Sequence, residues 1–236
     1  MTRWFENPLV IGVRSAIFHL ASWLVTAVFL LFLPFLWGPV SIAWWILQRY
    51  IGLQVWLLRV ICGQTYNIVF EEMPPDGPVI FAARHEALWE TLIPPVVLGN
   101  PVVFLKDDIL RYPVAGAVAR KLNYIGLDRT GAVDKVREAF VIARQYAADG
   151  RSFLIFPSGT RNPDHRLRVQ KGVAVLYRAL NLPVIPVVLN SGEFWPYKSW
   201  KRRPGTITVR VLPAIPNGQK STVFFEQLEH DLAREA

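Results

Sequence analysis

The pattern of hydrophobic and polar positions divides the chain at about residue 63. Two long apolar runs come before this point, and after it short apolar runs alternate with amphipathic stretches, as is typical of an α/β domain. The second part, residues 63–236, is long enough for one domain with its own core. Its short apolar runs predict strands near residues 66–71, 78–83, 101–105, 123–127, 152–156, 184–189 and 206–212. Its amphipathic stretches predict helices near residues 88–98, 113–121, 131–148, 170–180 and 221–234.

The first apolar run carries no formal charge over a long distance. Between Arg14 and Arg49 there is no Asp, Glu, Lys or Arg, which leaves 34 consecutive uncharged positions if His19 is neutral. A helix over residues 15–36 would be about 33 Å long, roughly the hydrocarbon thickness of a bilayer. We therefore expect a membrane segment in the N-terminal part of the chain.

Two breaks give this N-terminal part the pattern of a hairpin. Pro34 and the pair Gly38-Pro39 interrupt the apolar sequence, and a second apolar run follows them. Arg49 stands near the middle of the second run, where a charge at bilayer depth is costly. We expect residues 1–62 to form a membrane-embedded helical hairpin that stays in one leaflet. Two complete spans are one alternative. A cleaved signal peptide is another, although its apolar region would be only about 7–15 residues long.

Composition and charge favour a lipid partner. Of the 236 residues, 52% are hydrophobic and nine are tryptophan, which is more apolar than an ordinary soluble domain. The net charge of +8 predicts an acidic partner, either nucleic acid or anionic lipid. Because a membrane segment is already indicated, we expect membrane lipids and no nucleic acid. One basic-aromatic cluster is a candidate contact with the bilayer surface, with a simple solvated loop as the alternative. It comprises Trp195, Tyr197, Lys198, Trp200, Lys201, Arg202 and Arg203.

The most informative candidate for chemistry is a histidine followed five residues later by a glutamate. His85 and Glu90 come directly after the apolar run at residues 78–83, which has the pattern of a buried strand. On one continuous helix the two side chains would lie about 140° apart. They can meet only if His85 lies in the turn before a helix that Glu90 helps to start, where a carboxylate is favoured by the helix dipole. An imidazole held by a carboxylate is the general-base half of a Ser-His-Asp triad, and here the hydroxyl would arrive with the substrate.

Three further segments follow predicted strands and therefore belong to loops where ligands of α/β sheets collect. They are residues 106–116, the pair Asp128-Arg129, and residues 156–161. The last segment combines a rigid Pro157, a glycine that permits close backbone approach, and Arg161, whose planar guanidinium matches phosphate oxygens. These loops are candidate parts of one binding site.

Together these segments resemble the glycerolipid acyltransferase family, most closely the bacterial members that act on 1-acyl-glycerol-3-phosphate. The four blocks that carry the resemblance, in order, are His85–Glu90, Lys106–Gly116, Phe156–Arg161 and Val184–Val188, with Lys171-Gly172 also in place. The likeness covers roughly residues 60–215, and the hydrophobic hairpin before the first block resembles members of the family as well. It implies a single mixed-sheet α/β domain. It also implies transfer of an acyl group to the free hydroxyl of 1-acyl-glycerol-3-phosphate, giving phosphatidic acid in phospholipid biosynthesis.

The resemblance also implies roles for individual residues. His85 would take the proton from the hydroxyl of a lysophospholipid acceptor as that hydroxyl attacks the thioester of acyl-CoA or acyl-carrier protein, and Glu90 would orient the imidazole. Arg161, with Lys106 as a weaker candidate, would bind the phosphate of the acceptor. Backbone N–H groups near Gly159 would stabilise the oxyanion. The substrate-binding turn would comprise Ser158, Gly159, Thr160 and Arg161.

Two positions depart from the pattern of the family. The family usually has an aspartate where Glu90 stands and a glutamate where Ser158 stands. A glutamate has one more methylene and can still orient an imidazole. The serine removes a carboxylate from the acceptor-side turn, which leaves open an acceptor of another kind, such as a lyso-aminolipid or another lysophospholipid.

Two of the expected binding residues have simpler interpretations. Arg161 can form a surface ion pair with Asp164, and Lys106 can pair with Asp107 or Asp108. In that case each side chain would stabilise its own loop and bind no ligand.

The remaining expectations concern cofactors, location and other classes of function. No metal or cofactor is expected, because the four histidines lack ligand spacing. Cys62 is the only cysteine and suits a reducing compartment, so we expect the inner membrane with the catalytic domain on the cytoplasmic face. A membrane-anchored serine hydrolase using Ser158 is an alternative, although the Gly-x-Ser-x-Gly turn is missing. A noncatalytic lipid-binding module is another.

Overall fold

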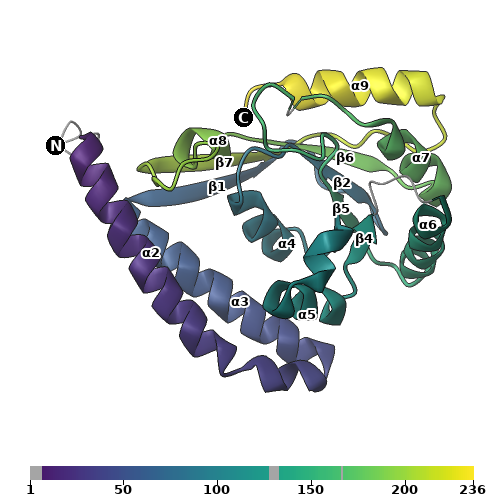
Figure 1. Cartoon of the computed structure of the whole chain (residues 1–236). Helices are drawn as coiled ribbons and strands as arrows, with labels where there is room; N and C mark the ends of the chain where they lie inside the picture. The colour runs from purple at the N-terminus through teal and green to yellow at the C-terminus, as the bar shows by residue number, and fades with distance from the viewer. Residues whose placement is uncertain (1–6, 128–132, 166) are drawn as a thin grey trace.

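A seven-stranded mixed sheet forms the centre of the molecule (Figure 1). The computed structural model describes residues 7–127, 133–165 and 167–236, with only the backbone of residues 133–136, so the Asp128-Arg129 pair lies outside the described residues. The strand order is β1-β7-β6-β2-β5-β3-β4, and all neighbours are parallel except β6 and β7. The strands are β1 Gln64–Phe70, β2 Ile80–Ala83, β3 Val102–Lys106, β4 Ile125–Leu127, β5 Phe153–Ile155, β6 Val184–Leu189 and β7 Gly205–Val211. Every predicted strand is present, which confirms the mixed α/β fold.

The helices of the domain also follow the predicted order, with one division. The helix predicted at residues 88–98 is a 3-10 turn followed by a short α-helix, because Pro94 and Pro95 have no backbone N–H to continue a single helix. The helices are η3 Trp89–Thr91, α4 Ile93–Val97, η4 Asp107–Arg111, α5 Pro113–Lys121, α6 Val133–Ala148, α7 Lys171–Leu180, α8 Ser191–Phe194 and α9 Ser221–Ala233. The pattern did not predict η4 or α8, each of which is only one turn or little more.

The sheet is covered on both faces, and its strands alternate between two cores. Ile80 and Ala82 of β2 belong to the core shared with α6, α7 and α9, whereas Phe81 and Ala83 belong to the core on the opposite face. This alternation follows from the two-residue period of a strand. Figure 1 shows α9 above the sheet and α4 and α5 below it. A sheet buried on both faces explains why its central strands are continuously apolar.

The N-terminal part is a helical hairpin that packs on the second core. It comprises α2 Pro8–Leu30, η1 Leu33–Trp37, α3 Val40–Leu57 and the π-helical turn η2 Leu58–Cys62. The first helix begins earlier than predicted because Asn7 caps it, accepting from the backbone N–H of Leu9 at 2.9 Å, and Pro8 suits the first helical position. Phe18 and Ile51 are buried in the core beneath the sheet. The hairpin is therefore joined to the domain by packing as well as by sequence.

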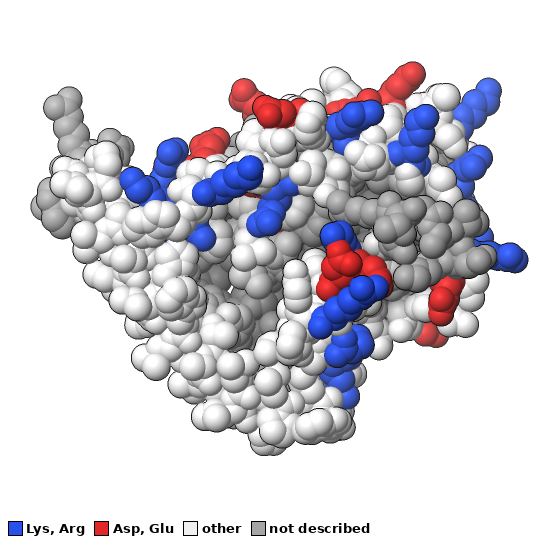
Figure 2. Space-filling view, viewed as in Figure 1, with Lys and Arg blue, Asp and Glu red and all other residues white. Residues whose placement is uncertain are grey.

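The outer face of the hairpin exposes many large apolar side chains. Among the described residues, α2 is the one helix long and apolar enough to cross a membrane, and only 11% of its most apolar window is buried. Figure 2 shows the hairpin as a mostly white lobe, with Lys and Arg concentrated above and beside it. The most exposed apolar residues of the hairpin are Leu9, Val13, Leu20, Trp23, Leu24, Leu31 and Trp37.

The bend of the hairpin contacts the domain at α5. The Nζ atom of Lys121, the last residue of α5, donates a hydrogen bond to the carbonyl of Gly38 at the bend. Figure 1 shows the bend below α5, so the hairpin and the domain are joined at both ends of α3. A space is left between these two joints, and the cavity described below occupies it.

The close packing of α5 gives a prediction about stability. A Cβ atom at Gly116 would lie 2.2 Å from the carbonyl oxygen of Leu110, whereas a Cβ atom at Gly172 of α7 would meet nothing within 4 Å. We expect Gly116→Ala to lower the free energy of unfolding by about 2 kcal/mol or more, because backbone must move. Gly172→Ala is the matched control and should leave it unchanged or raise it by up to about 1 kcal/mol. Denaturant unfolding in detergent measures both, and equal stabilities would contradict this packing.

Candidate functional site

Four adjacent parallel strands, in the order β6-β2-β5-β3, bring the predicted segments to one edge of the sheet. β2 pairs with both β5 and β6, and β5 pairs with β3, so the carboxyl ends of these four strands lie together. β2 leads into His85, β5 leads into Phe156, and β3 ends at Lys106. The register pairs Ala82 with Ile155, which places the two following loops side by side.

His85 and Glu90 meet in the way that their spacing predicts. His85 lies in the turn after β2, and Glu90 lies in η3, the helical turn that follows. The Nδ1 atom of His85 is 3.4 Å from Oε1 of Glu90, with the histidine side chain 15% exposed and the glutamate side chain fully buried. With its proton on Nδ1 the imidazole donates to the carboxylate, and Nε2 is left as the basic nitrogen.

Further donors surround the buried carboxylate of Glu90. Its Oε1 atom accepts from the backbone N–H of Glu86 and, at 2.6 Å, from that of Ala87. Its Oε2 atom accepts from the hydroxyl of Ser191 at 2.8 Å. A buried carboxylate is stable only when donors replace its hydration, and these contacts provide them. The sequence interpretation missed Ser191, although its position directly after the strand predicted at residues 184–189 places it at the same edge of the sheet.

The residues on either side of His85 fix the turn to the rest of the domain. The guanidinium of Arg84 is buried and donates to the carbonyl of Leu232 at the end of α9, at 2.7 and 3.0 Å. It also lies 3.4 Å from Oε1 of Glu86. The Oε2 atom of Glu86 accepts from the backbone N–H of Gly192 at 3.0 Å. His85 is thus the partly exposed residue between two buried and anchored ones.

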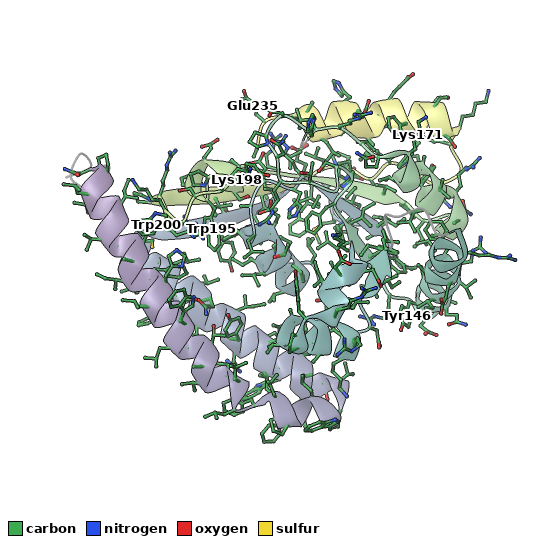
Figure 3. The ribbon with its side chains drawn as sticks, viewed as in Figure 1. Tyr146, Lys171, Trp195, Lys198, Trp200 and Glu235 are labelled. Carbon is green, nitrogen blue, oxygen red and sulfur yellow. The ribbon has the colours of Figure 1, made fainter. Side chains whose placement is uncertain are left out.

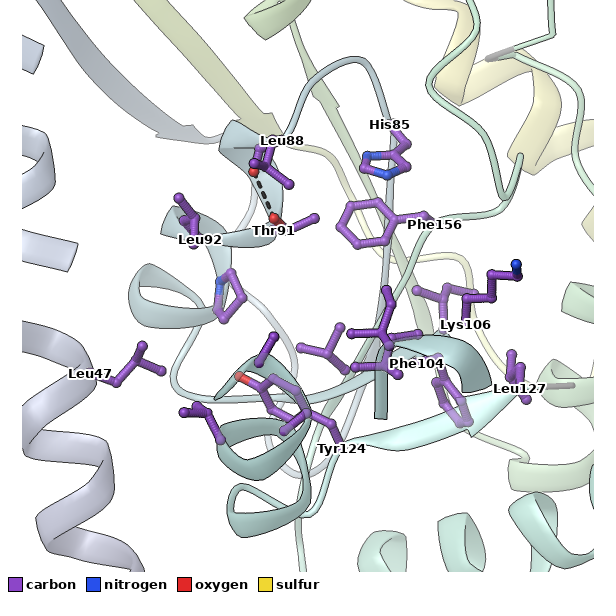
Figure 4. Close-up of a pocket in the computed structure, with 18 of the residues that line it drawn as sticks. Leu47, His85, Leu88, Thr91, Leu92, Phe104, Lys106, Tyr124, Leu127 and Phe156 are labelled. Carbon is purple, nitrogen blue, oxygen red and sulfur yellow. Dashed lines mark hydrogen bonds between the residues drawn. The ribbon is translucent and has the colours of Figure 1, made fainter. Parts of the chain in front are cut away.

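An aromatic side chain holds the imidazole from the other side. The ring of Phe156, directly after β5, stacks on His85 with centroids 4.3 Å apart and planes inclined by 27° (Figure 4). Together with the contact to Glu90, this stacking restricts rotation of the imidazole. Such restriction is what a general base needs if Nε2 is to meet one particular hydroxyl.

His85 and Phe156 form part of the wall of a large apolar cavity. Its volume is about 1240 Å³, and it extends between the hairpin, α4, α5 and the sheet. Figure 4 shows His85 at one side of this cavity and Leu47 of α3 at the other. Pockets of this size and character bind ligands with long apolar parts. The apolar lining includes Phe29, Leu33, Leu36, Ile46, Leu47, Leu92, Val103, Ile109, Val118 and Tyr124.

The predicted substrate-binding turn also lines the cavity. Ser158, Gly159 and Thr160 are all part of its wall. The hydroxyl of Ser158 donates to the carbonyl of Thr160 at 2.9 Å, and the N–H of Gly159 donates to the carbonyl of Phe156 at 2.9 Å. Gly159 has a φ of 64°, in the left-handed region that favours glycine. These particular groups therefore stabilise the turn that forms this part of the wall.

The predicted phosphate-binding residues lie in different places. Lys106 lines the cavity and forms an ion pair with Asp108, as one of the simpler interpretations expected. Arg161 is exposed and lies next to Thr160, outside the set of described residues that line the cavity. His165 and Arg168 line the cavity, and the sequence interpretation assigned neither of them a role. Both follow the substrate-binding turn within a few residues, so their position in the sequence could have predicted that they lie near the cavity.

The basic-aromatic cluster is partly internal. Trp195 is buried and donates from Nε1 to Oε1 of Gln64 at 2.6 Å, and the guanidinium of Arg202 lies 4.0 Å from the centre of its ring. Burial lowers the pKa of Arg202 to about 10. Tyr197 and Trp200 are 40% and 51% exposed. Figure 3 shows Trp200 beside α2, and the carbonyl of Trp200 lies 2.7 Å from Nε2 of His19 on that helix.

No group of three or more His, Cys, Asp or Glu side chains with the arrangement of a metal site occurs in the part of the chain that the structure describes. Cys62, the last residue of the hairpin, is buried and lies apart from His85 and Glu90 in the sequence.

Comparison with known proteins identifies the family of the chain. Residues 66–190, more than half of the chain, match a protein family described as Acyltransferase. A 171-residue stretch, 72% of this chain, is 29% identical to a 1-acyl-sn-glycerol-3-phosphate acyltransferase from Pseudomonas aeruginosa and covers 66% of that protein. A relative of the same description from Cocos nucifera is 30% identical over 165 residues, 67% of this chain and 52% of the relative. The chain thus spans between half and two thirds of these relatives.

One solved structure is similar over nearly the whole chain. It is the crystal structure of the 1-acyl-sn-glycerophosphate (LPA) acyltransferase, PlsC, from Thermotoga maritima, with a TM-score of 0.72. The likeness covers 96% of this chain and 99% of that chain at 18% sequence identity. It therefore includes the N-terminal hairpin as well as the domain, and it supports the fold.

Proposed function

Because the chain belongs to the acyltransferase family, we propose that it transfers an acyl group from an acyl thioester to the free hydroxyl of 1-acyl-glycerol-3-phosphate. The product would be phosphatidic acid, a precursor in phospholipid biosynthesis. The observation that carries this proposal is the His85–Glu90 pair on the wall of a large apolar cavity. The descriptions of the relatives from Pseudomonas aeruginosa and Cocos nucifera support the choice of acceptor.

The geometry suits a reaction in which the substrate brings its own hydroxyl. Nε2 of His85 removes the proton of the acceptor hydroxyl as its oxygen attacks the thioester carbonyl. The carboxylate of Glu90 stabilises the imidazolium that forms. When the tetrahedral intermediate collapses, the carbon–sulfur bond breaks and the imidazolium returns the proton to the leaving thiolate. The products are the new ester and the free thiol of CoA or acyl-carrier protein.

The cavity and the loops around it provide places for both substrates. Acyl chains would occupy the apolar space between α3, α4 and α5, where van der Waals contacts and release of water stabilise them. The phosphate of the acceptor would be bound by Arg161, with Lys106 as a second cation. Ser158, Gly159 and Thr160 would shape the acceptor side of the cavity.

A different lyso-lipid acceptor is a second candidate, and Ser158 supports it. Because the Ser158 hydroxyl is used within its own turn, this position presents neither a carboxylate nor a free hydroxyl to the acceptor. The same hydrogen bond argues against Ser158 as a hydrolase nucleophile, which would need a nearby base as partner. Measuring acyl transfer to 1-acyl-glycerol-3-phosphate and to a lyso-aminolipid distinguishes the two candidate acceptors.

The hairpin would attach the enzyme to the membrane that supplies its acceptor. Its exposed apolar face and the adjacent Trp200 suit insertion into one leaflet, with the domain at the surface. The bilayer would be the inner membrane and the domain would face the cytoplasm, where the acyl thioester donors are available. Residues 1–62 would thus be the embedded part and residues 63–236 the catalytic part.

Two substitutions test the catalytic pair. Acyl transfer from labelled acyl-CoA to a panel of lyso-lipids would be measured for the wild type, His85→Ala and Glu90→Gln. We expect His85→Ala to lower kcat by about 10²–10⁴-fold through loss of the base. Glu90→Gln keeps the shape of the side chain but removes its charge, and should lower kcat by a factor on the order of 10⁴.

The control for this experiment is Glu193→Gln, which neutralises an exposed carboxylate near Ser191 and should leave kcat unchanged. Thermal unfolding of each variant shows whether it is folded. A folded Glu90→Gln enzyme with nearly wild-type kcat would refute the proposed mechanism, and absence of labelled phosphatidic acid from the wild type would refute the proposed acceptor.

A second prediction concerns Arg161. If its guanidinium binds the phosphate of the acceptor, Arg161→Ala should raise the KM for phosphate-bearing acceptors by about 10–100-fold, with little change in kcat. Arg178→Ala, an exposed arginine on α7, is the matched control and should change neither constant. An unchanged KM in Arg161→Ala would remove Arg161 from the binding site.

A third prediction concerns membrane attachment. Replacing Leu20, Trp23 and Leu24 on the exposed face of α2 by serine removes apolar area, and should lower co-sedimentation with anionic phospholipid vesicles at least about tenfold. The control replaces Val141 and Val223, which are 48% and 49% exposed on α6 and α9, by serine, and should bind vesicles like the wild type. Equal binding by the two variants would show that the hairpin is not the anchor.

A further inference from the structure

The second carboxylate oxygen of Glu90 has a partner from a distant part of the chain. Ser191 is the first residue of α8, immediately beyond β6 and Asn190, and its Oγ lies 2.8 Å from Oε2 of Glu90. Both residues are completely buried, with exposed fractions of 0%. We propose that Ser191 is a positioning residue that holds the Glu90 carboxylate in the orientation required by His85. This proposal rests on the proposed acyl transfer and deepens it.

The need for such a residue follows from the other contacts of Glu90. Oε1 meets His85 and the backbone N–H groups of Glu86 and Ala87, whereas Oε2 meets none of these groups and is buried as well. The hydroxyl of Ser191 donates to Oε2, so that any rotation of the carboxylate away from His85 would break this hydrogen bond too. It also provides the one side-chain donor that Oε2 has among the hydrogen bonds of the described residues.

The turn that carries Ser191 is itself held in place by the catalytic turn. The backbone N–H of Gly192 donates to Oε2 of Glu86 at 3.0 Å, and the carbonyl of Ser191 accepts from Trp195 at 2.8 Å. The start of α8 therefore contacts the carboxylates of both Glu86 and Glu90, which follow His85 in the same turn. Because these contacts hold the turn in place, the hydroxyl of Ser191 has a fixed position from which it can orient Glu90.

The role predicts a specific kinetic effect. Ser191 lies behind Glu90 and is not part of the cavity wall formed by the described residues, so it would not contact either substrate. Its hydrogen bond matters most when the imidazolium forms and Glu90 must face it. Ser191→Ala should therefore lower kcat by about 10–100-fold, the effect of losing a hydrogen bond to a charged group. The KM for donor and acceptor should change by no more than about twofold.

A matched pair of variants separates the hydroxyl from the shape of the side chain. Threonine and valine have nearly the same volume, but only threonine has the hydroxyl. Both add a methyl group to a buried site, so any packing penalty is common to both. We expect the kcat of Ser191→Thr to exceed that of Ser191→Val by at least about fivefold. Equal kcat values for the two variants would overturn the proposal, even if Ser191→Ala does not fold.

A double-mutant cycle tests whether Ser191 acts through Glu90. In the Glu90→Gln enzyme the charge that Ser191 orients is already absent, so adding Ser191→Ala should lower kcat by no more than about twofold. A general structural role would lower kcat by the same factor in both backgrounds, and that result would overturn the proposal. If the wild type transfers no acyl group at all, the proposed function fails first. If the wild type is active and Ser191→Ala retains full kcat, only the role of Ser191 fails.

Discussion

A carboxylate that has lost contact with water must be surrounded by hydrogen-bond donors, and the turn at residues 84–91 is built around one such group. Glu90 is fully buried, and backbone N–H groups, a hydroxyl and an imidazole approach its two oxygens. These donors come from the turn that follows β2 and from the start of α8, which follows β6. The carboxylate therefore holds together the two segments that follow these strands. The orientation of His85 follows from that requirement.

In the proposed function, the hairpin links the catalytic site to the lipid bilayer. Its inner face completes the core beneath the sheet and one wall of the cavity, while its outer face remains apolar and exposed. The same two helices therefore serve as packing partner, cavity wall and proposed membrane anchor. In the proposed function, the apolar cavity would receive the chains of a lipid acceptor, which reduces the cost of removing them from the membrane. Lys121 joins the bend to α5 and keeps that wall in place.

Local patterns predicted the elements well because strands and helices have short periods. The seven strands and the two-helix hairpin follow from runs of apolar residues and from Pro34 and Gly38-Pro39. The His85–Glu90 contact was also predictable, since five residues suffice to define a turn. By contrast, Ser191 lies 101 residues from Glu90. Such contacts depend on strand order, which periodicity does not determine, and the inward hydrogen bond of Ser158 depends on a rotamer that composition does not reveal.

Arg84 connects the catalytic turn to the far end of the sequence. Its guanidinium donates to the carbonyls of Leu232 and Arg234 at the end of α9, where no further helical turn provides N–H donors for them. If those acceptors were displaced, a buried cation next to His85 would lose hydrogen bonds that water could not replace. Purification tags fused close behind α9, or proteolytic trimming of this helix, would thus disturb a site that lies across the domain. Recombinant protein with an untouched α9 is accordingly the appropriate material for enzymology.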